Sequence, residues 1–182
     1  MTRPEDAASQ LDRDLRAVIR DVPDFPKPGI LFKDVTPLVG TPDLFRRVSD
    51  RMATGHGVGA VQHVVGIESR GFIFGAPVAL ALGAGFVPVR KPGKLPARSI
   101  REDYALEYGT DSLEIHADAI VEGAGVLVVD DVLATGGTAA ATCRLVERAG
   151  GRVVGCVFLI ELAALGGRGR LRGIPVDSVL AY

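Results

Sequence analysis

Two adjacent carboxylates, Asp130 and Asp131, directly follow the apolar run Val126–Val129. Burying like charges side by side is costly unless a cation or hydrogen-bond donors offset their repulsion. Magnesium would supply the cation, and ribose hydroxyls would supply the hydrogen-bond donors. We therefore expect these aspartates to bind a diol at the end of a buried strand. The alternative is one solvent-facing aspartate and one that lies beside the following helix.

The next segment, Ala134–Thr138 with the sequence ATGGT, predicts an anion site. Gly136 and Gly137 let the backbone approach a ligand, and a helix that starts here directs its N–H groups and positive dipole end toward that ligand. The hydroxyls of Thr135 and Thr138 add donors. A nucleoside triphosphate-binding loop would need a lysine after the glycines, which is absent from this sequence. A diol site beside a phosphate site matches the shape of a ribose 5-phosphate.

Short apolar strands that alternate with helices position this segment. Such alternation is typical of parallel strands joined by crossover helices that cover both faces of a sheet. We predict an α/β fold, with a central, mostly parallel sheet flanked by helices, in a single domain of residues 1–182. The expected strands are HVVGI around Val64, FVPV around Val87, VLVVD around Val128 and VVGCVFLIEL around Val157, and the expected helices are 72–82 and 138–149.

The N-terminal region shows a different pattern. Apolar residues between positions 11 and 22 recur at helical spacing and predict an amphipathic helix that stops at Pro23. Three prolines in the segment 23–34 then predict an irregular, extended loop. Thr41 followed by Pro42 predicts the start of another helix.

A long, charged and proline-containing segment follows Arg90 and extends over residues 91–108, before a hairpin expected to turn near Gly109. Loops of this length in a compact domain are usually lids or binding loops. We expect it to close over a bound substrate.

Two further glycine-rich segments predict no site. The sequence GHGVGA at Gly55–Ala60 matches the dinucleotide-binding pattern, but it follows a helix and precedes a strand, so we interpret it as a polar turn. The sequence GGRGRLRG at Gly166–Gly173 has three arginines without aromatic residues between them. It therefore lacks the stacking platform of a single-strand nucleic-acid site and is expected to be a solvated connection.

Composition narrows the class of protein. The chain has 182 residues and a formal net charge of -1, so no overall field favours nucleic acid or an anionic membrane. The charged N-terminal region predicts no signal peptide, and no later apolar run is long enough to span a bilayer. Two cysteines without metal-site spacing indicate a reducing cytoplasm.

The segment VVDDVLATGGT resembles the phosphoribosyl pyrophosphate signature of the type I phosphoribosyltransferases. The likeness extends through DFPKPGILFKDVTPL, GIESRGFIFG, PVRKPGKLP and LEYGTDSLEIH. Within this family, the chain resembles the members that act on adenine. This resemblance implies transfer of phosphoribose from 5-phosphoribosyl 1-pyrophosphate to adenine, which yields AMP and pyrophosphate. It also implies a homodimer, a hood of about residues 1–40, a lid at about 91–108, and Mg²⁺ held mainly by substrate and water without a direct protein ligand.

The same resemblance assigns roles to individual residues. It implies that the ribose 5-phosphate is bound by Asp130, Asp131, Ala134, Thr135, Gly136, Gly137 and Thr138, and adenine by Leu31, Phe32, Lys33 and Val132. Pyrophosphate is assigned to Glu68, Ser69, Arg70, Arg90, Lys91 and Lys94, with Arg90 reaching across a dimer interface. The implied catalytic residues are Glu107, Asp130, Asp131 and Arg70. The Glu68–Ser69 peptide is expected to be cis.

Two other functions keep the same phosphoribosyl pyrophosphate site. One is transfer to a 6-oxopurine, against which the sequence around Phe32 argues. The other is a regulator that senses phosphoribosyl pyrophosphate without catalysis. Such a regulator needs an added DNA-binding domain, for which the chain has neither spare length nor positive charge.

Overall fold

The computed structural model describes residues 4–57, 59–106 and 109–182. The chain divides into two compact units, Met1–Arg51 and Met52–Tyr182. The segment expected as a hood, residues 1–40, lies within the first unit. No helix among the described residues has the length and apolar character needed to cross a membrane.

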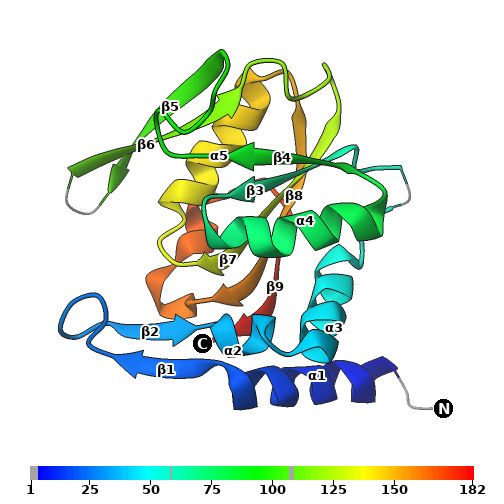
Figure 1. Ribbon diagram of the computed structural model, residues 1–182, viewed down its shortest axis with the longest axis vertical. Helices are drawn as coiled ribbons and strands as arrows, with labels where there is room; N and C mark the ends of the chain where they lie inside the picture. The colour runs from blue at the N-terminus through cyan, green and yellow to red at the C-terminus, as the bar shows by residue number, and fades with distance from the viewer. Residues whose placement is uncertain (1–3, 58, 107–108) are drawn as a thin grey trace. The chain divides into compact units, whose positions relative to one another are not determined.

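In the first unit, helices flank a small hairpin (Figure 1). Leu15 and Val48 are fully buried on the apolar faces of its two longer helices. The two strands pair antiparallel, and Lys33 Nζ lies 2.6 Å from Asp21 Oδ1 across the pair. The elements of this unit are α1 (Pro4–Val18), β1 (Arg20–Pro23), β2 (Leu31–Asp34), α2 (Thr36–Val39) and α3 (Pro42–Ala53).

The hairpin corrects two expectations. The first helix ends at Val18 instead of continuing to Pro23, and the second half of the expected loop is strand β2. Val22 lies opposite Phe32 in the β1–β2 register. Pairing between residues far apart in sequence has overridden the helical periodicity at Val22, a β-branched residue that suits a strand. The predicted helix start at Pro42 is confirmed.

The second unit confirms the expected fold class. Its central sheet has five parallel strands in the order β4-β3-β7-β8-β9, and helices follow β3 and β7 (Figure 1). The elements are β3 (His63–Ile67), α4 (Arg70–Leu82), β4 (Gly85–Val89), β5 (Ser99–Leu106), β6 (Gly109–His116), β7 (Gly125–Leu133), α5 (Gly137–Arg148), β8 (Arg152–Glu161), η1 (Ala163–Leu165), η2 (Gly167–Arg170) and β9 (Val176–Ala181).

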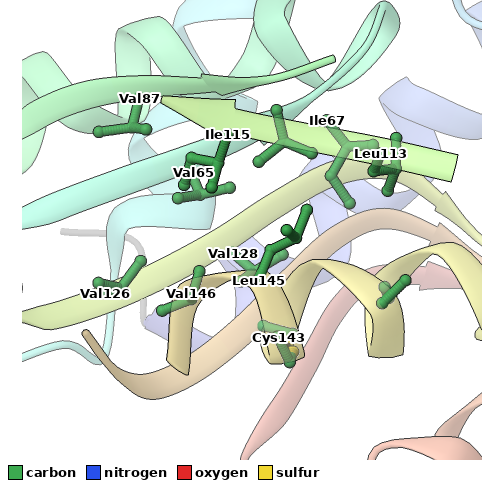
Figure 2. Packing of buried hydrophobic residues seen from close by; sticks show 14 of the residues in the cluster. Val65, Ile67, Val87, Leu113, Ile115, Val126, Val128, Cys143, Leu145 and Val146 are labelled. Carbon is green, nitrogen blue, oxygen red and sulfur yellow. Dashed lines mark hydrogen bonds between the residues drawn. The ribbon is translucent and has the colours of Figure 1, made fainter. Parts of the chain in front are cut away.

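The two helices cover opposite faces of this sheet. Val65 and Val128 belong to a buried cluster that includes Leu145 of α5, and Figure 2 shows these side chains together. The neighbouring residue of β3, Gly66, points the other way, where a β-carbon would come 3.1 Å from the carbonyl oxygen of the α4 residue Gly71. Alternate strand residues face opposite sides of a sheet, so both faces are covered, as a parallel sheet requires.

The β5–β6 hairpin packs on the same face of the sheet as α5. Tyr104 and Leu113 join the buried cluster, and Glu102 pairs with Arg144 and Arg148 of α5. The hairpin expected to turn near Gly109 is confirmed, but its first strand begins at Ser99, within the segment expected to be a loop. Tertiary burial stabilises a strand where charge and proline content favoured a loop.

Candidate functional site

A pocket of about 520 Å³ lies at the carboxyl ends of the neighbouring strands β3 and β7. The chain leaves β3 toward β4 on one side and leaves β7 toward β8 on the other, and such a switch point is where open parallel sheets bind ligands. Three places in the chain supply the polar walls: the first residues of α4, the aspartates of β7, and the β5–β6 hairpin. The pocket is lined by Ile67, Glu68, Ser69, Arg70, Lys91, Tyr104, Asp111, Leu113, Asp130, Asp131, Val132, Ala134 and Thr138.

Asp130 and Asp131 lie within β7, which continues to Leu133. The backbone N–H of Asp131 donates to Asp130 Oδ1 at 2.9 Å. Burial and the adjacent charge of Asp131 raise the pKa of Asp130 well above its ordinary value. Burial also raises the pKa of Asp131, although Arg70 acts in the opposite direction. The pair therefore favours a ligand that brings donors or positive charge.

Asp131 Oδ2 is the atom best placed to accept such a donor. It is buried, and Arg70 Nε lies 2.6 Å away as an ion pair. The contact lacks the alignment of a hydrogen bond, and Oδ2 accepts none from the part of the chain that the structure describes. A hydroxyl group or a hydrated cation would suit this oxygen. Among the described residues, no group of three His, Cys, Asp or Glu side chains is placed to hold a metal ion.

The Ala134–Thr138 turn leads from β7 into α5 and borders a hollow of about 80 Å³. Gly136 has a φ of 79° at the N-terminal cap of α5, a conformation that favours glycine. No side chain caps this end within the described residues. The first N–H groups of the helix therefore face the hollow, as an anion site requires.

Just before α4, the Glu68–Ser69 peptide is cis, as expected. Glu68 Oε2 accepts hydrogen bonds from Arg90 Nε at 3.1 Å and from the Lys91 backbone N–H at 3.0 Å. Arg90 in turn donates to the carbonyl oxygen of Lys94 at 3.1 Å. Glu68, Ser69, Arg70 and Lys91 thus line the pocket, whereas Arg90 and Lys94 lie behind its lining.

Two residues of the pocket wall, Tyr104 and Asp111, were not expected from the sequence. The Tyr104 hydroxyl donates to Asp111 Oδ2 at 3.1 Å, and Lys91 forms an ion pair with the same carboxylate. Burial acts to lower the pKa of Lys91, but the hydrogen bonds and charge interactions with Asp111 and Tyr104 together outweigh it, and the pKa lies above its ordinary value. The apolar–polar alternation of Leu113, Glu114 and Ile115 is the signal that could have predicted the second strand of this hairpin wall.

The residues expected to bind adenine lie on two elements. Leu31, Phe32 and Lys33 are on β2 of the first unit, and Val132 is on β7 in the second. The Lys33 side chain pairs with Asp21, and the Phe32 ring meets the Phe25 ring edge-on with centroids 5.0 Å apart. Glu107 lies outside the described residues.

A larger hollow of about 620 Å³ borders the last turn of α5, near Arg98, Glu122 and Arg148. It lies away from the carboxyl ends of the strands, where parallel sheets bind ligands. The wall includes both acidic and basic side chains and contains none of the residues expected from the sequence. We therefore assign the functional site to the smaller pocket.

Comparison with known proteins gives a match over most of the chain. A model of the phosphoribosyl transferase domain matches residues 47–177. The chain is 60% identical over 169 residues to an adenine phosphoribosyltransferase of Myxococcus xanthus, covering 93% of this chain and 92% of that protein. It is 57% identical to the enzyme of the same name from Acaryochloris marina, covering 93% of this chain and 99% of the other.

Solved structures give the same result. An adenine phosphoribosyltransferase from Rhodothermus marinus superposes with a TM-score of 0.91 at 56% identity, covering 96% of this chain and 99% of that one. The enzyme from Saccharomyces cerevisiae, solved with an imino-altritol bisphosphate and adenine, superposes with a TM-score of 0.88 at 41% identity, covering 93% and 99%.

Proposed function

Because the chain belongs to the phosphoribosyl transferase domain family, and within it to the adenine phosphoribosyltransferases, we propose which of its residues carry out the reaction. The enzyme transfers phosphoribose from 5-phosphoribosyl 1-pyrophosphate to adenine, giving AMP and pyrophosphate, and so salvages a purine. One observation carries the assignment of residues. The partly buried Asp130 and the buried Asp131 stand just before an uncapped helix N-terminus at the switch point of the sheet.

Asp130 and Asp131 bind the ribose hydroxyls in this proposal. Ala134, Thr135, Gly136, Gly137 and Thr138 surround the 5-phosphate, which their N–H groups and hydroxyls contact. The raised pKa values of the two aspartates support the role, because bound hydroxyl donors would stabilise the charged carboxylates. Groups fixed in this way hold the anomeric carbon for attack without reorganising during the reaction.

The leaving pyrophosphate lies against the lining residues Glu68, Ser69, Arg70 and Lys91, and Arg90 orders them through its hydrogen bonds to Glu68 and to the Lys94 carbonyl oxygen. Arg70 enters the pocket from the first turn of α4, and Lys91 from the end of β4. Positive charge here stabilises negative charge that develops on pyrophosphate as the anomeric carbon gains oxocarbenium character. Lys91 exchanges its ion pair with Asp111 for the pyrophosphate oxygens.

Magnesium is the proposed cofactor, and the paired carboxylates with the unsatisfied Asp131 Oδ2 fit it. Asp130 and Asp131 would hold it mainly through substrate hydroxyls and water. When bound, it supplies further neutralisation of the pyrophosphate charge.

Adenine is bound by the β2 segment together with Val132, with the Phe32 ring stacked on the purine. Because the Lys33 side chain is engaged with Asp21, the proposal assigns purine recognition at Leu31 and Lys33 to main-chain groups. Such groups distinguish a 6-amino from a 6-oxo purine, since one donates a hydrogen bond where the other accepts. Glu107 manages the imidazole proton of adenine as the new bond forms, and the lid expected at about residues 91–108 excludes water.

We also place the enzyme in a reducing cytoplasm as a homodimer. Cys143 and Cys156 are buried free thiols whose sulfur atoms lie 3.6 Å apart, a pair that an oxidising compartment could bridge. The dimer is supported by exposed apolar side chains on α4, including Leu80.

An assay with radiolabelled adenine, hypoxanthine and guanine tests the function directly. Each base is incubated with phosphoribosyl pyrophosphate, with magnesium and again with excess chelator. The expected result is AMP from adenine alone, and only with magnesium. Product from hypoxanthine or guanine at a comparable rate would contradict the base assignment, and binding of phosphoribosyl pyrophosphate without product from any base would favour a sensor.

A further inference from the structure

The Gly166–Gly173 segment, expected to be a solvated connection, contains the buried residues Gly167 and Leu171. Leu171 joins the apolar cluster between the sheet and α5. Gly167 begins η2 and lies directly behind the Ala134–Thr138 turn. The segment is thus attached to the second unit at the edge where the phosphate site forms.

Two glycines allow the backbones to touch at this point. A β-carbon on Gly136 would lie 2.4 Å from the carbonyl oxygen of Gly167. A β-carbon on Gly167 would in turn lie 2.3 Å from the carbonyl oxygen of Ala134 and 3.0 Å from the Leu133 side chain. Neither distance is possible for a real side chain, so any residue other than glycine at position 167 must displace the turn that it supports.

Arg168, the residue after Gly167, anchors the segment to two strands. Its Nε lies 2.7 and 2.9 Å from the two carboxylate oxygens of Glu161, the last residue of β8. Its other nitrogens donate to the carbonyl oxygen of Val176 at 2.6 Å and to Ser178 Oγ at 3.0 Å, both on β9. A planar guanidinium makes all these contacts at once, which lysine cannot do.

Glu161 connects this anchor to the strand that carries the aspartates. It lies opposite Leu133 in the β7–β8 register, immediately before the phosphate turn. The hydrogen bond from Arg168 lowers the pKa of Glu161, so the pair stays charged through the neutral range. Ser178 Oγ also donates to Glu161 Oε2 at 2.8 Å, which satisfies the buried carboxylate.

We propose that Gly167 and Arg168 are positioning residues for the 5-phosphate site, with Gly167 as the rigid backing of the Ala134–Thr138 turn and Arg168 as its anchor to the sheet. The proposal rests on the proposed function, because it takes this turn to bind the substrate phosphate. It predicts that changes at these residues act on ligands carrying the 5-phosphate and leave affinity for adenine unaltered.

The test compares Gly167→Ala with Gly169→Ala in the full chain. Position 169 has open space around its would-be β-carbon and lies only two residues away, so it is a matched control. Gly167→Ala should raise the KM for phosphoribosyl pyrophosphate and the Kd for ribose 5-phosphate about tenfold or more, since small misplacements in a preorganised site are costly. The KM for adenine should stay within about twofold, and Gly169→Ala should match the parent.

Arg168→Gln is the second variant. If Gly167→Ala does not fold, Arg168→Gln alone tests the proposed positioning role. Its side chain is about half exposed, so the loss of charge leaves the core intact. It should raise the same two constants about threefold or more without changing the KM for adenine. Unchanged ribose 5-phosphate affinity in both folded variants would overturn the proposal, as would equal changes in both KM values.

The outcome for the parent chain separates the two claims. If the parent binds ribose 5-phosphate but makes no AMP, the proposed function fails. The comparison between variants then still tests whether Gly167 supports the Ala134–Thr138 turn. If the parent does not bind ribose 5-phosphate, both claims are overturned.

Discussion

Substitution of Asp131 should lower catalytic turnover without unfolding the protein. The Asp131 carboxylate is nearly fully buried, and Asp131→Asn keeps the shape while removing the charge that pairs with Arg70 and that the proposed contact with the ribose hydroxyls requires. We expect turnover to fall by at least about tenfold, because preorganised polar groups are typically worth this or more. Steady-state kinetics with adenine and circular dichroism measure the two properties. Asp118→Asn, at an exposed position, is the control, and full activity in Asp131→Asn would remove it from the mechanism.

The raised pKa of Asp130 should make the free energy of unfolding depend on pH. Burial and the charge of Asp131 raise its folded-state pKa above the ordinary value of 3.8, so the folded protein binds this proton more tightly than the unfolded chain. Stability is then lost as pH rises above about 4 through the folded-state pKa. Asp130→Asn removes that loss and should unfold at a higher temperature than the parent at neutral pH.

The difference in melting temperature between Asp130→Asn and the parent should shrink as the pH falls toward 3.8, the ordinary pKa that Asp130 keeps in the unfolded chain. Thermal unfolding without ligands, measured from acid to neutral pH, checks this sign. A difference that grows toward acid pH would contradict the assignment of the raised pKa.

At the level of single residues, the sequence was sufficient where the pocket residues are neighbours in the chain. The aspartates and the ATGGT turn are adjacent in the chain, and a strand followed by a helix places them without further information. Tyr104 and Asp111 were missed because they reach the pocket only through the β5–β6 pairing. Gly167 was missed because its contact with Gly136 joins residues that are far apart in sequence.

The first turn of α4 is an element whose approach to β7 sets the position of Asp130. A β-carbon on Gly71 would lie 2.8 Å from Asp130 Oδ1 and 2.9 Å from the carbonyl oxygen of Val129. Gly71→Ala should therefore shift the aspartate and lower kcat about tenfold, with a loss of about 1–3 kcal/mol in the free energy of unfolding from overpacking.

Gly75→Ala is the matched control in the same helix. Its β-carbon would lie 2.9 Å from the ring of Phe86, a partly exposed side chain that can move, and it is remote from the aspartates. It should destabilise the protein and lower kcat less than Gly71→Ala does, because it reaches the pocket only through the contacts of Phe86 with Phe72 and of Phe72 with Arg90. Kinetics combined with chemical denaturation of both variants measure the split, and equal effects on kcat would show that Gly71 has no special relation to Asp130.

Among the elements, the parallel strands were the easiest to predict because apolar runs bounded by helices leave few alternatives. HVVGI matches β3 residue for residue. The hairpin turn near Gly109 was also predicted, whereas β1, β2, the early start of β5 and the edge strand β9 were not. In β1–β2 and β5–β6, the strands are short or charged, and their stability comes from cross-strand partners and packing that local periodicity does not contain.

At the scale of the whole molecule, α4 presents an apolar surface that a single chain leaves exposed. Leu80 is 83% exposed and Ile73 is 38% exposed on this helix, and Phe86 of the adjacent β4 is 36% exposed. A two-fold dimer buries the same patch of both subunits against each other, so an apolar face of this kind suits a homodimer interface.

This surface is connected to the pyrophosphate side of the pocket. The Phe86 ring meets the Phe72 ring edge-on at 5.9 Å, and the Arg90 guanidinium lies 6.0 Å from the Phe72 centroid. Arg90 then donates to Glu68, which borders the pocket. A partner subunit that covers α4 would hold Phe72 and Arg90 in place, and this route agrees with the expected position of Arg90 near the interface.

Leu80→Glu tests both the dimer and its link to activity. A charge at the centre of the apolar face should convert the protein to monomer in sedimentation velocity, because an unpaired carboxylate is costly to bury. Activity at low concentration should fall with it, and high enzyme concentration should restore part of the loss by mass action. Val121→Glu alters an apolar residue that is 69% exposed in the connection between β6 and β7, and should remain a fully active dimer. A parent that sediments as a monomer while retaining full activity would refute the dimer proposal, and a fully active Leu80→Glu monomer would leave Arg90 acting entirely within its own chain.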